Sequence, residues 1–131
     1  MSLPRAVLGL TGLAFLAFGA GFTLWPVPMG ALVDIQLPSS TARIDFTATY
    51  GGFELGFGSF LLLCLRRPDW IEAGLLAGAL ALGGFAVVRL LSLLVSEMPV
   101  RSAIYVALVL EISGVLLNAW ALKALRARMR S

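Results

Sequence analysis

The sequence predicts an all-α integral membrane protein, built as a single four-helix bundle with both termini in the cytoplasm. Of its 131 residues, 60% are hydrophobic and 13% are charged, whereas a soluble domain carries about 25% charged residues. Four apolar runs each approach the roughly 20 residues that a helix needs to cross a bilayer. The links between the last three runs are short, so neighbouring helices are expected to lie antiparallel in one bundle.

The hydrophobic runs and the prolines between them divide the chain. We expect one domain, residues 1–131, with helices at about residues 5–25, 46–65, 70–95 and 100–122. The first run ends at Trp25, an interfacial aromatic residue, and Pro26 and Pro28 stop the helix. Residues 26–45 form the longest link, the outer loop. Within it, residues 29–37 are mildly amphipathic and predict a short helix along the membrane surface.

Basic residues are distributed unequally between the two sides of this bundle. Arg43 and Arg101 fall on one side. Seven basic residues fall on the other: Arg5, Arg66, Arg67, Lys123, Arg126, Arg128 and Arg130. Because cytoplasmic loops carry the excess of Lys and Arg, this asymmetry predicts that both termini are cytoplasmic.

Several function classes are disfavoured by what the composition lacks. The chain has no histidine and a single cysteine, Cys64, so we expect no metal centre and no cofactor. It carries no nucleophile–base pair, phosphate-binding loop or Cys/His cluster, so we expect no catalytic residue. The basic C-terminal run follows a membrane segment, and we interpret it as a topology signal rather than a nucleic-acid site.

Three ionisable residues lie inside the predicted spans. Counted from the outer ends of their helices at about 1.5 Å per residue, Glu54 lies about 12 Å deep, Arg89 about 9 Å and Glu111 about 15 Å. All three therefore fall in one thin slab of the outer half of the bilayer. A carboxylate at such a depth costs at least ~2.5 kcal/mol on insertion scales, and such residues usually face a bundle interior or a wet cavity.

Charged side chains in this apolar slab are expected to form ion pairs or to be neutralised. Arg89 keeps its proton, so it requires a carboxylate partner. With two glutamates at its level, we expect one ion pair and one protonated carboxyl group, and the sequence leaves open which glutamate forms the pair. Tyr50 lies one turn above Glu54, while Ser92 and Ser96 lie on the Arg89 side of its helix.

We therefore predict a polar pocket for a ligand. Its candidate binding residues are Glu54, Arg89, Glu111, Tyr50, Arg43 and Asn118, with Arg43 at the mouth. Its candidate apolar walls are Phe53, Phe57, Phe60 and Phe85. The glycines near Glu54 are expected to let neighbouring helices approach closely: Gly51, Gly52, Gly56 and Gly58.

A purely structural interpretation competes with this prediction. A Glu–Arg–Glu cluster can fix the register of a helix bundle without binding anything. For Asn118 alone, one interhelical amide hydrogen bond is the simpler explanation.

Residues 49–56 (TYGGFELG), with Arg43 upstream, resemble a motif in a family of small, uncharacterised bacterial four-helix membrane proteins. That family is distantly similar to the DoxX group. The resemblance covers most of the chain by layout, and it implies the four-helix fold and a multi-pass location in the bacterial inner membrane. It implies no activity.

The function predicted from these observations is binding of a lipophilic or amphiphilic small molecule, or of a membrane lipid, without turnover. One alternative is an accessory subunit of a larger membrane complex, or a homo-oligomer, that docks through its glycine-rich helix faces. Another is an isomerase-like enzyme that uses an intramembrane carboxyl group as proton donor.

Overall fold

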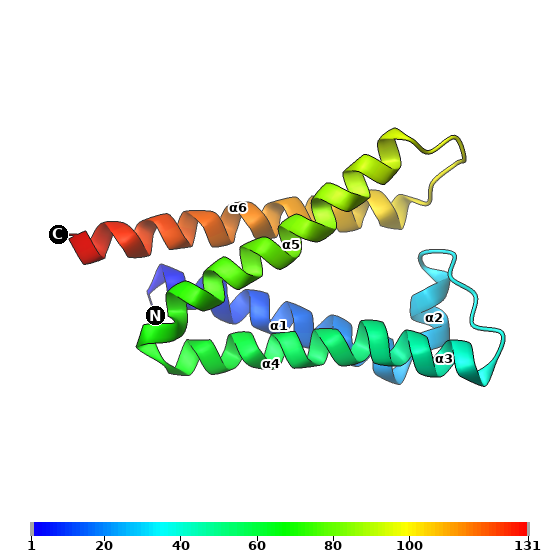
Figure 1. Cartoon of the computed structure of the whole chain (residues 1–131), viewed down its shortest axis with the longest axis horizontal. Helices are drawn as coiled ribbons and strands as arrows, with labels where there is room; N and C mark the ends of the chain where they lie inside the picture. Colours follow the sequence, from blue (N-terminus) through cyan, green and yellow to red (C-terminus); the bar gives the residue numbers. More distant parts are fainter. Residues whose placement is uncertain (1, 131) are drawn as a thin grey trace.

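The computed structural model describes residues 2–130, with side chains as far as Met129. Within that range the chain forms helices and no strand, as Figure 1 shows. Four segments are long and apolar enough to span a membrane: Leu3–Leu24, Ser40–Arg66, Pro68–Leu94 and Ser102–Met129. The structure thus confirms the all-helical prediction and indicates a multi-pass membrane protein.

The first helix and the link after it follow from their prolines. Helix α1 (Leu3–Leu24) ends just before Pro26, which cannot continue a helical hydrogen-bond ladder. Pro26 and Pro28 then lie in the first turn of a short helix, α2 (Pro26–Ala31), where a missing N–H costs nothing. The short helix therefore lies at 26–31 rather than at the expected 29–37. Asp34 follows with φ 60°, a left-handed conformation that Asp tolerates.

The second span begins at Ser40 rather than near residue 46. It is one continuous rod made of α3 (Ser40–Phe46), the π-helical segment η1 (Thr47–Gly52) and α4 (Phe53–Arg66). The side chain of Ser39 caps its start by accepting a hydrogen bond from the Ala42 amide at 3.1 Å. Its wider π turn ends at Gly52, two residues before Glu54.

The second half of the chain forms a long helical hairpin. A 3₁₀ turn, η2 (Pro68–Trp70), leads into α5 (Ile71–Leu94), and α6 (Ser102–Arg130) returns. Helix α6 continues past residue 122 through the basic tail, which contains good helix formers and neither Gly nor Pro. Arg126 ties this extension to α5 with a hydrogen bond of 2.8 Å to Glu72.

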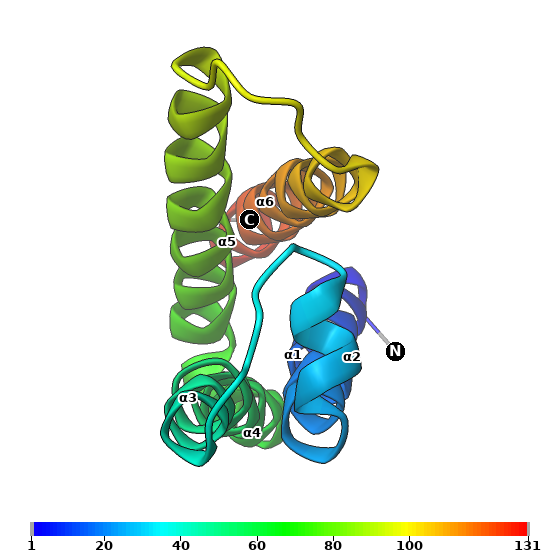
Figure 2. The same ribbon diagram turned by 90° about the vertical axis from the view of Figure 1, so that its right-hand side faces the viewer.

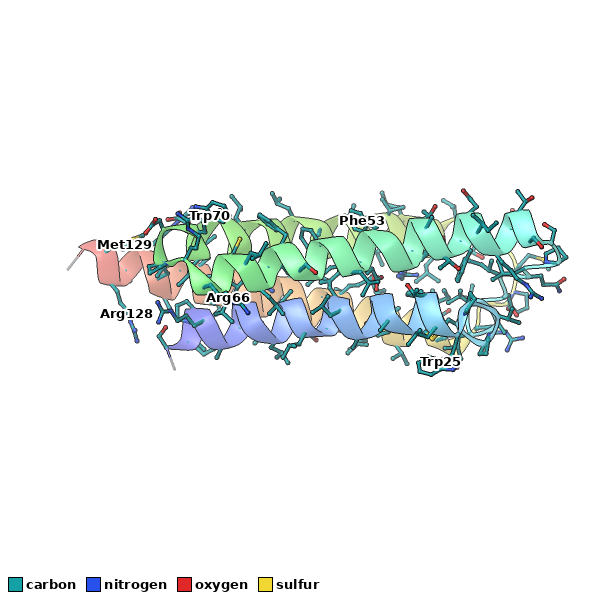
Figure 3. The ribbon with its side chains drawn as sticks, turned by 90° about the horizontal axis from the view of Figure 1, so that it is seen from below. Trp25, Phe53, Arg66, Trp70, Arg128 and Met129 are labelled. Atoms are coloured by element: carbon teal, nitrogen blue, oxygen red, sulfur yellow. The ribbon has the colours of Figure 1, made fainter. Side chains whose placement is uncertain are left out.

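The helices associate mainly as two pairs, α1 with α4 and α5 with α6. We call the end of the bundle that holds both chain termini and η2 the terminal end, and the opposite end, with residues 25–39 and 95–101, the loop end. The two pairs meet at the terminal end and diverge toward the loop end, as Figures 1 and 2 show. Trp70 and Trp25 lie at opposite ends (Figure 3), where interfacial aromatic residues are expected.

The main cluster of buried apolar side chains lies toward the terminal end. It combines the start of α1, the end of α4, the start of α5 and the end of α6: Val7, Leu8, Phe15, Leu61, Cys64, Ile71, Leu75, Ala121 and Leu122. In the other half, α5 and the start of α6 expose large apolar side chains such as Val88, Leu91 and Val106. Such faces suit contact with lipid tails.

Glycines bring α1 and the second span into close contact. A Cβ on Gly58 would lie 2.8 Å from the carbonyl oxygen of Gly12, and one on Gly51 would collide with the side chain of Thr23. By contrast, a Cβ on Gly56 would meet nothing within 4 Å, and one on Gly52 would meet only a carbonyl oxygen at 4.0 Å. Two of the four glycines expected to permit close packing therefore do so.

Candidate functional site

The candidate site is built around an ion pair between α5 and α6. Arg89 donates from Nε to both oxygens of Glu111, at 3.1 and 3.0 Å, and from Nη2 to Oε1 at 2.7 Å. The Arg89 side chain is 26% exposed and that of Glu111 only 11%. Glu111 is therefore the glutamate that pairs with Arg89, in the two-pronged geometry that makes such pairs strong.

Glu54 lies apart from this pair, on α4. Its Oε2 is buried and has no hydrogen-bond partner among residues 2–130. Of the two glutamates predicted to share the site, Glu111 is therefore paired with Arg89 and Glu54 is not. Apolar surroundings favour the neutral form of an unpaired carboxyl group.

Tyr50, on η1, joins aromatic side chains of the loop half. Its ring centroid lies 4.7 Å from that of Phe46 and 5.7 Å from that of Phe22. Its hydroxyl also lies close enough to the Arg89 guanidinium for an electrostatic interaction. The ring contacts of Tyr50 therefore join η1 to α1 and α3, within one helix pair.

Asn118 lies at a different depth, in the bundle interior with no exposed surface. Its amide nitrogen donates to the hydroxyl of Thr11 and to the carbonyl of Gly114, both at 2.9 Å. The hydroxyl of Thr11 in turn donates to the carbonyl of Val7 at 2.9 Å. Asn118 therefore links α6 to α1, as the simpler interpretation of this residue predicted.

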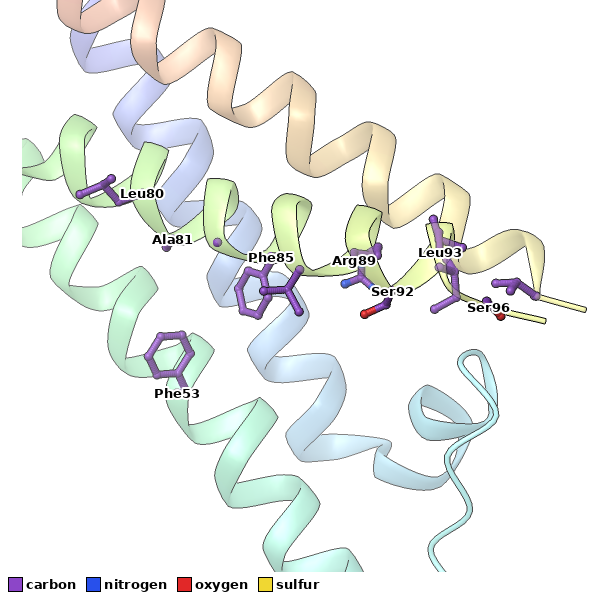
Figure 4. Close-up of a pocket in the computed structure, with 12 residues that line it drawn as sticks. Phe53, Leu80, Ala81, Phe85, Arg89, Ser92, Leu93 and Ser96 are labelled. Carbon is purple, nitrogen blue, oxygen red and sulfur yellow. The ribbon is translucent and has the colours of Figure 1, made fainter. Parts of the chain in front are cut away.

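A groove opens between α4, the loop half of α5 and the start of α6, and we call it the α4–α5 groove. Its volume is about 790 Å³. It is lined by Phe53, Leu80, Ala81, Gly84, Phe85, Val88, Arg89, Ser92, Leu93, Ser96, Val100 and Ile104. In Figure 4, Phe53 on α4 lies across the groove from Phe85 on α5, and Arg89, Ser92 and Ser96 follow toward the loop end. One end of the groove wall is thus apolar and the other carries polar groups.

The six predicted binding residues therefore lie in separate places. Arg89 lines the α4–α5 groove, and Glu111 binds Arg89 without lining the groove itself. Glu54, Tyr50 and Asn118 do not line this groove. Arg43 lines a second groove between α1 and the second span, which includes Thr23 and Gly52. Of the four predicted apolar walls, Phe53 and Phe85 line the first groove, and Phe57 packs edge-on against Phe15 with a centroid distance of 4.8 Å.

Sequence reasoning missed the π-helical segment and the role of Gly84. The dipeptide Gly51-Gly52, two residues before Glu54, was the available signal for an irregular turn, since glycines permit close contacts and π segments occur at functional sites. Gly84 lines the groove, and a Cβ there would meet nothing within 4 Å. Among the described residues, no group of three His, Cys, Asp or Glu side chains is arranged to hold a metal ion.

Comparison with known proteins identifies the family and nothing further. No curated protein and no solved structure matches the chain. Residues 3–122 match a family described as a domain of unknown function, DUF4345. That match covers the first three long helices and most of α6, so the chain belongs to the DUF4345 family.

Proposed function

We propose that this protein binds an amphiphilic small molecule or lipid in the α4–α5 groove, without turning it over. The observation that carries this proposal is an ionised arginine on the wall of a laterally open, apolar groove of about 790 Å³. Apolar pockets with a few convergent polar groups are the usual setting for lipophilic ligands. The tail of the ligand would contact Phe53 and Phe85, and its head would reach Arg89 and Ser92.

The ion pair restricts the head group of the ligand. Arg89 is neutralised by Glu111, yet its Nη1 has no hydrogen-bond partner within the described part of the chain. An anionic head would approach the Glu111 carboxylate in a medium of low dielectric constant, which is unfavourable. We therefore infer an uncharged head that accepts hydrogen bonds, such as an ester, a quinone carbonyl or an alcohol, on a lipid, quinone or isoprenoid-like tail.

Glycine substitutions inside the grooves give a test that leaves the fold intact. Gly84→Leu would project its side chain into the α4–α5 groove, because a Cβ at Gly84 has no neighbour within 4 Å. Gly52→Leu is the matched control, since Gly52 lines only the second groove and its Cβ would also be unhindered. We expect native mass spectrometry of gently extracted protein to show a small adduct in wild type and Gly52→Leu that disappears in Gly84→Leu.

The outcome separates this proposal from its alternatives. A Gly84→Leu variant that retains every small adduct of wild type would place the ligand elsewhere and overturn the proposal. A stoichiometric protein partner in place of a small adduct would favour an accessory subunit. The isomerase-like alternative rests on the buried, unpaired Oε2 of Glu54, and it requires that a hydrophobic substrate be converted by wild type and not by Glu54→Gln.

We also propose a bacterial inner-membrane location with both termini in the cytoplasm, and a distant relationship to the DoxX group. The orientation is supported by the terminal end, where the basic residues Arg5, Arg66 and Arg67 and the basic part of α6 lie, against Arg43 and Arg101 at the loop end. Labelling of single cysteines introduced at Asp34 and Asp69, in a Cys64→Ala background, tests the orientation. Only the cysteine at residue 34 should react with an impermeant reagent added outside intact cells.

A further inference from the structure

We propose a second, independent binding site, in which Arg43 and the groove below it hold one anionic phospholipid. This groove, the α1–α4 groove, lies between α1 and the second span and has a volume of about 470 Å³. Thr23, Arg43, Ile44, Thr47, Ala48, Gly52 and Leu55 line it. Gly52 and Phe53 are neighbours about 100° apart around the helix axis, so the two grooves lie on different faces of the same helix.

Arg43 is positioned to receive a phosphate group. Its Nε donates to the carbonyl of Leu37 at 3.4 Å, which restrains the side chain, and neither of its terminal nitrogens has a partner in the described chain. It has no carboxylate within ion-pair distance there, whereas Arg101, the other arginine of the loop end, is paired with Asp34 at 2.6 Å. Arginine binds phosphate through its planar set of donors.

The depth of Arg43 matches that of a lipid head group. The second span has 27 residues, which is about 40 Å of helix against roughly 30 Å of hydrocarbon. Arg43 lies three residues after its start at Ser40, in the part that extends beyond the hydrocarbon. Trp25, an interfacial residue type, lies at the same end (Figure 3).

Below Arg43 the groove has the form of a track for one acyl chain. Thr47 lies one turn down on the same face, and Ala48, Gly52 and Leu55 continue the track toward the middle of the span. The small side chains of Ala48 and Gly52 leave the space open. Thr23, on α1, forms the opposite wall of the groove.

The charge of the groove selects the class of lipid. Arg43 is the single ionisable residue of the lining. A phosphatidylglycerol head group, with net negative charge, complements that arginine, whereas the quaternary amine of phosphatidylcholine would be repelled by it. The site therefore prefers anionic over zwitterionic phospholipid.

The test uses the full chain, delipidated in detergent and titrated with phosphatidylglycerol or phosphatidylcholine under native mass spectrometry. We expect wild type to retain one phosphatidylglycerol in preference to phosphatidylcholine. Arg43→Gln should weaken that binding about tenfold, since a charge-assisted contact is lost, and Arg43→Lys should restore most of it. Gly52→Leu should weaken it as well, because the added side chain would occupy the groove and its Cβ would meet only a carbonyl oxygen at 4.0 Å.

Two control variants make the result specific. Arg101→Gln removes a loop-end charge that Asp34 already pairs, and Gly84→Leu fills the other groove. Both should bind phosphatidylglycerol as wild type does, whatever the fate of the ligand in the α4–α5 groove. Equal retention in wild type, Arg43→Gln and Gly52→Leu would overturn the proposal, as would an equal loss in Arg101→Gln.

Discussion

The terminal half and the loop half of the bundle are held together by different forces. In the terminal half all four long helices contribute to one apolar core, and Asn118 and Thr11 connect α6 to α1 within it. In the loop half the two helix pairs diverge (Figures 1 and 2). There α5 and α6 are joined by the bidentate pair of Arg89 and Glu111, next to an open groove.

This difference separates stability from binding. Close-packed helices leave no room for a ligand, so the terminal half is suited to hold the fold together. The loop half leaves large apolar side chains and a groove uncovered, which is where a membrane-soluble ligand has access. We therefore expect packing changes to reduce the free energy of unfolding in the terminal half, and groove changes to alter binding in the loop half.

The largest expected change in stability comes from the loop half, at the ion pair of Arg89 and Glu111. Glu111→Ala should lower the free energy of unfolding by about 3 kcal/mol, because it leaves the guanidinium of Arg89 unpaired in a low-dielectric setting. The partial exposure of Arg89, 26%, places the loss at the lower end of the usual range. Unfolding by a denaturing detergent in mixed micelles measures it.

The double variant Arg89→Leu/Glu111→Leu is the control for the ion pair. Replacing both charges by apolar groups should restore most of the lost stability. A single Glu111→Ala variant as stable as wild type would show that the loop half does not depend on this pair.

The next largest effect tests close packing between α1 and α4. Gly58→Ala should cost about 2 kcal/mol of unfolding free energy, since overpacking of a tight contact carries such a penalty. The added Cβ would lie 2.8 Å from the Gly12 carbonyl oxygen and 2.9 Å from the amide nitrogen of Leu16, and backbone atoms cannot easily move aside. The same unfolding assay applies.

Gly56→Ala is the matched control on the same helix, because its Cβ would meet nothing within 4 Å. It should unfold as wild type does. Equal destabilisation by the two substitutions would point to a loss of helix flexibility rather than to a clash at the α1–α4 contact.

A smaller effect is expected from the buried amide. Asn118→Ala should lower the free energy of unfolding by about 1 kcal/mol, the scale of an interhelical hydrogen bond within a membrane. A double-mutant cycle with Thr11→Val isolates the bond between them, which is 2.9 Å long. Strict additivity in that cycle would mean that Asn118 acts by filling space alone.

The smallest effect concerns the exposed contact between the two loops. Asp34 accepts a hydrogen bond from Arg101 and raises the pKa of that guanidinium, but both side chains are 60% exposed. Asp34→Asn removes the charge and keeps a residue that tolerates the left-handed conformation. No measurable change in thermal unfolding is expected. A large loss of thermal stability would mean that the loops, and not only the Arg89–Glu111 pair, hold the loop half together.

Much of the fold follows from local patterns. The four spans depend on hydrophobicity, and the break at Pro26 depends on the missing N–H of proline. The start of the second span at Ser40 and the helical tail after residue 122 were not predicted. Polar residues at a helix end obscure where a membrane helix stops, because helices continue beyond the hydrocarbon.

The sequence by itself determined that this is a helical membrane protein with one arginine and two glutamates inside its apolar spans, since hydropathy and residue order along each helix suffice for both. Only the tertiary structure decided that Glu111 pairs with Arg89, that Glu54 has no such partner, and that Arg43 lines a groove of its own. Those outcomes depend on how each helix is rotated and tilted against its neighbours. Rotation and tilt come from side-chain packing between segments far apart in the chain, which residue counting along one helix does not contain.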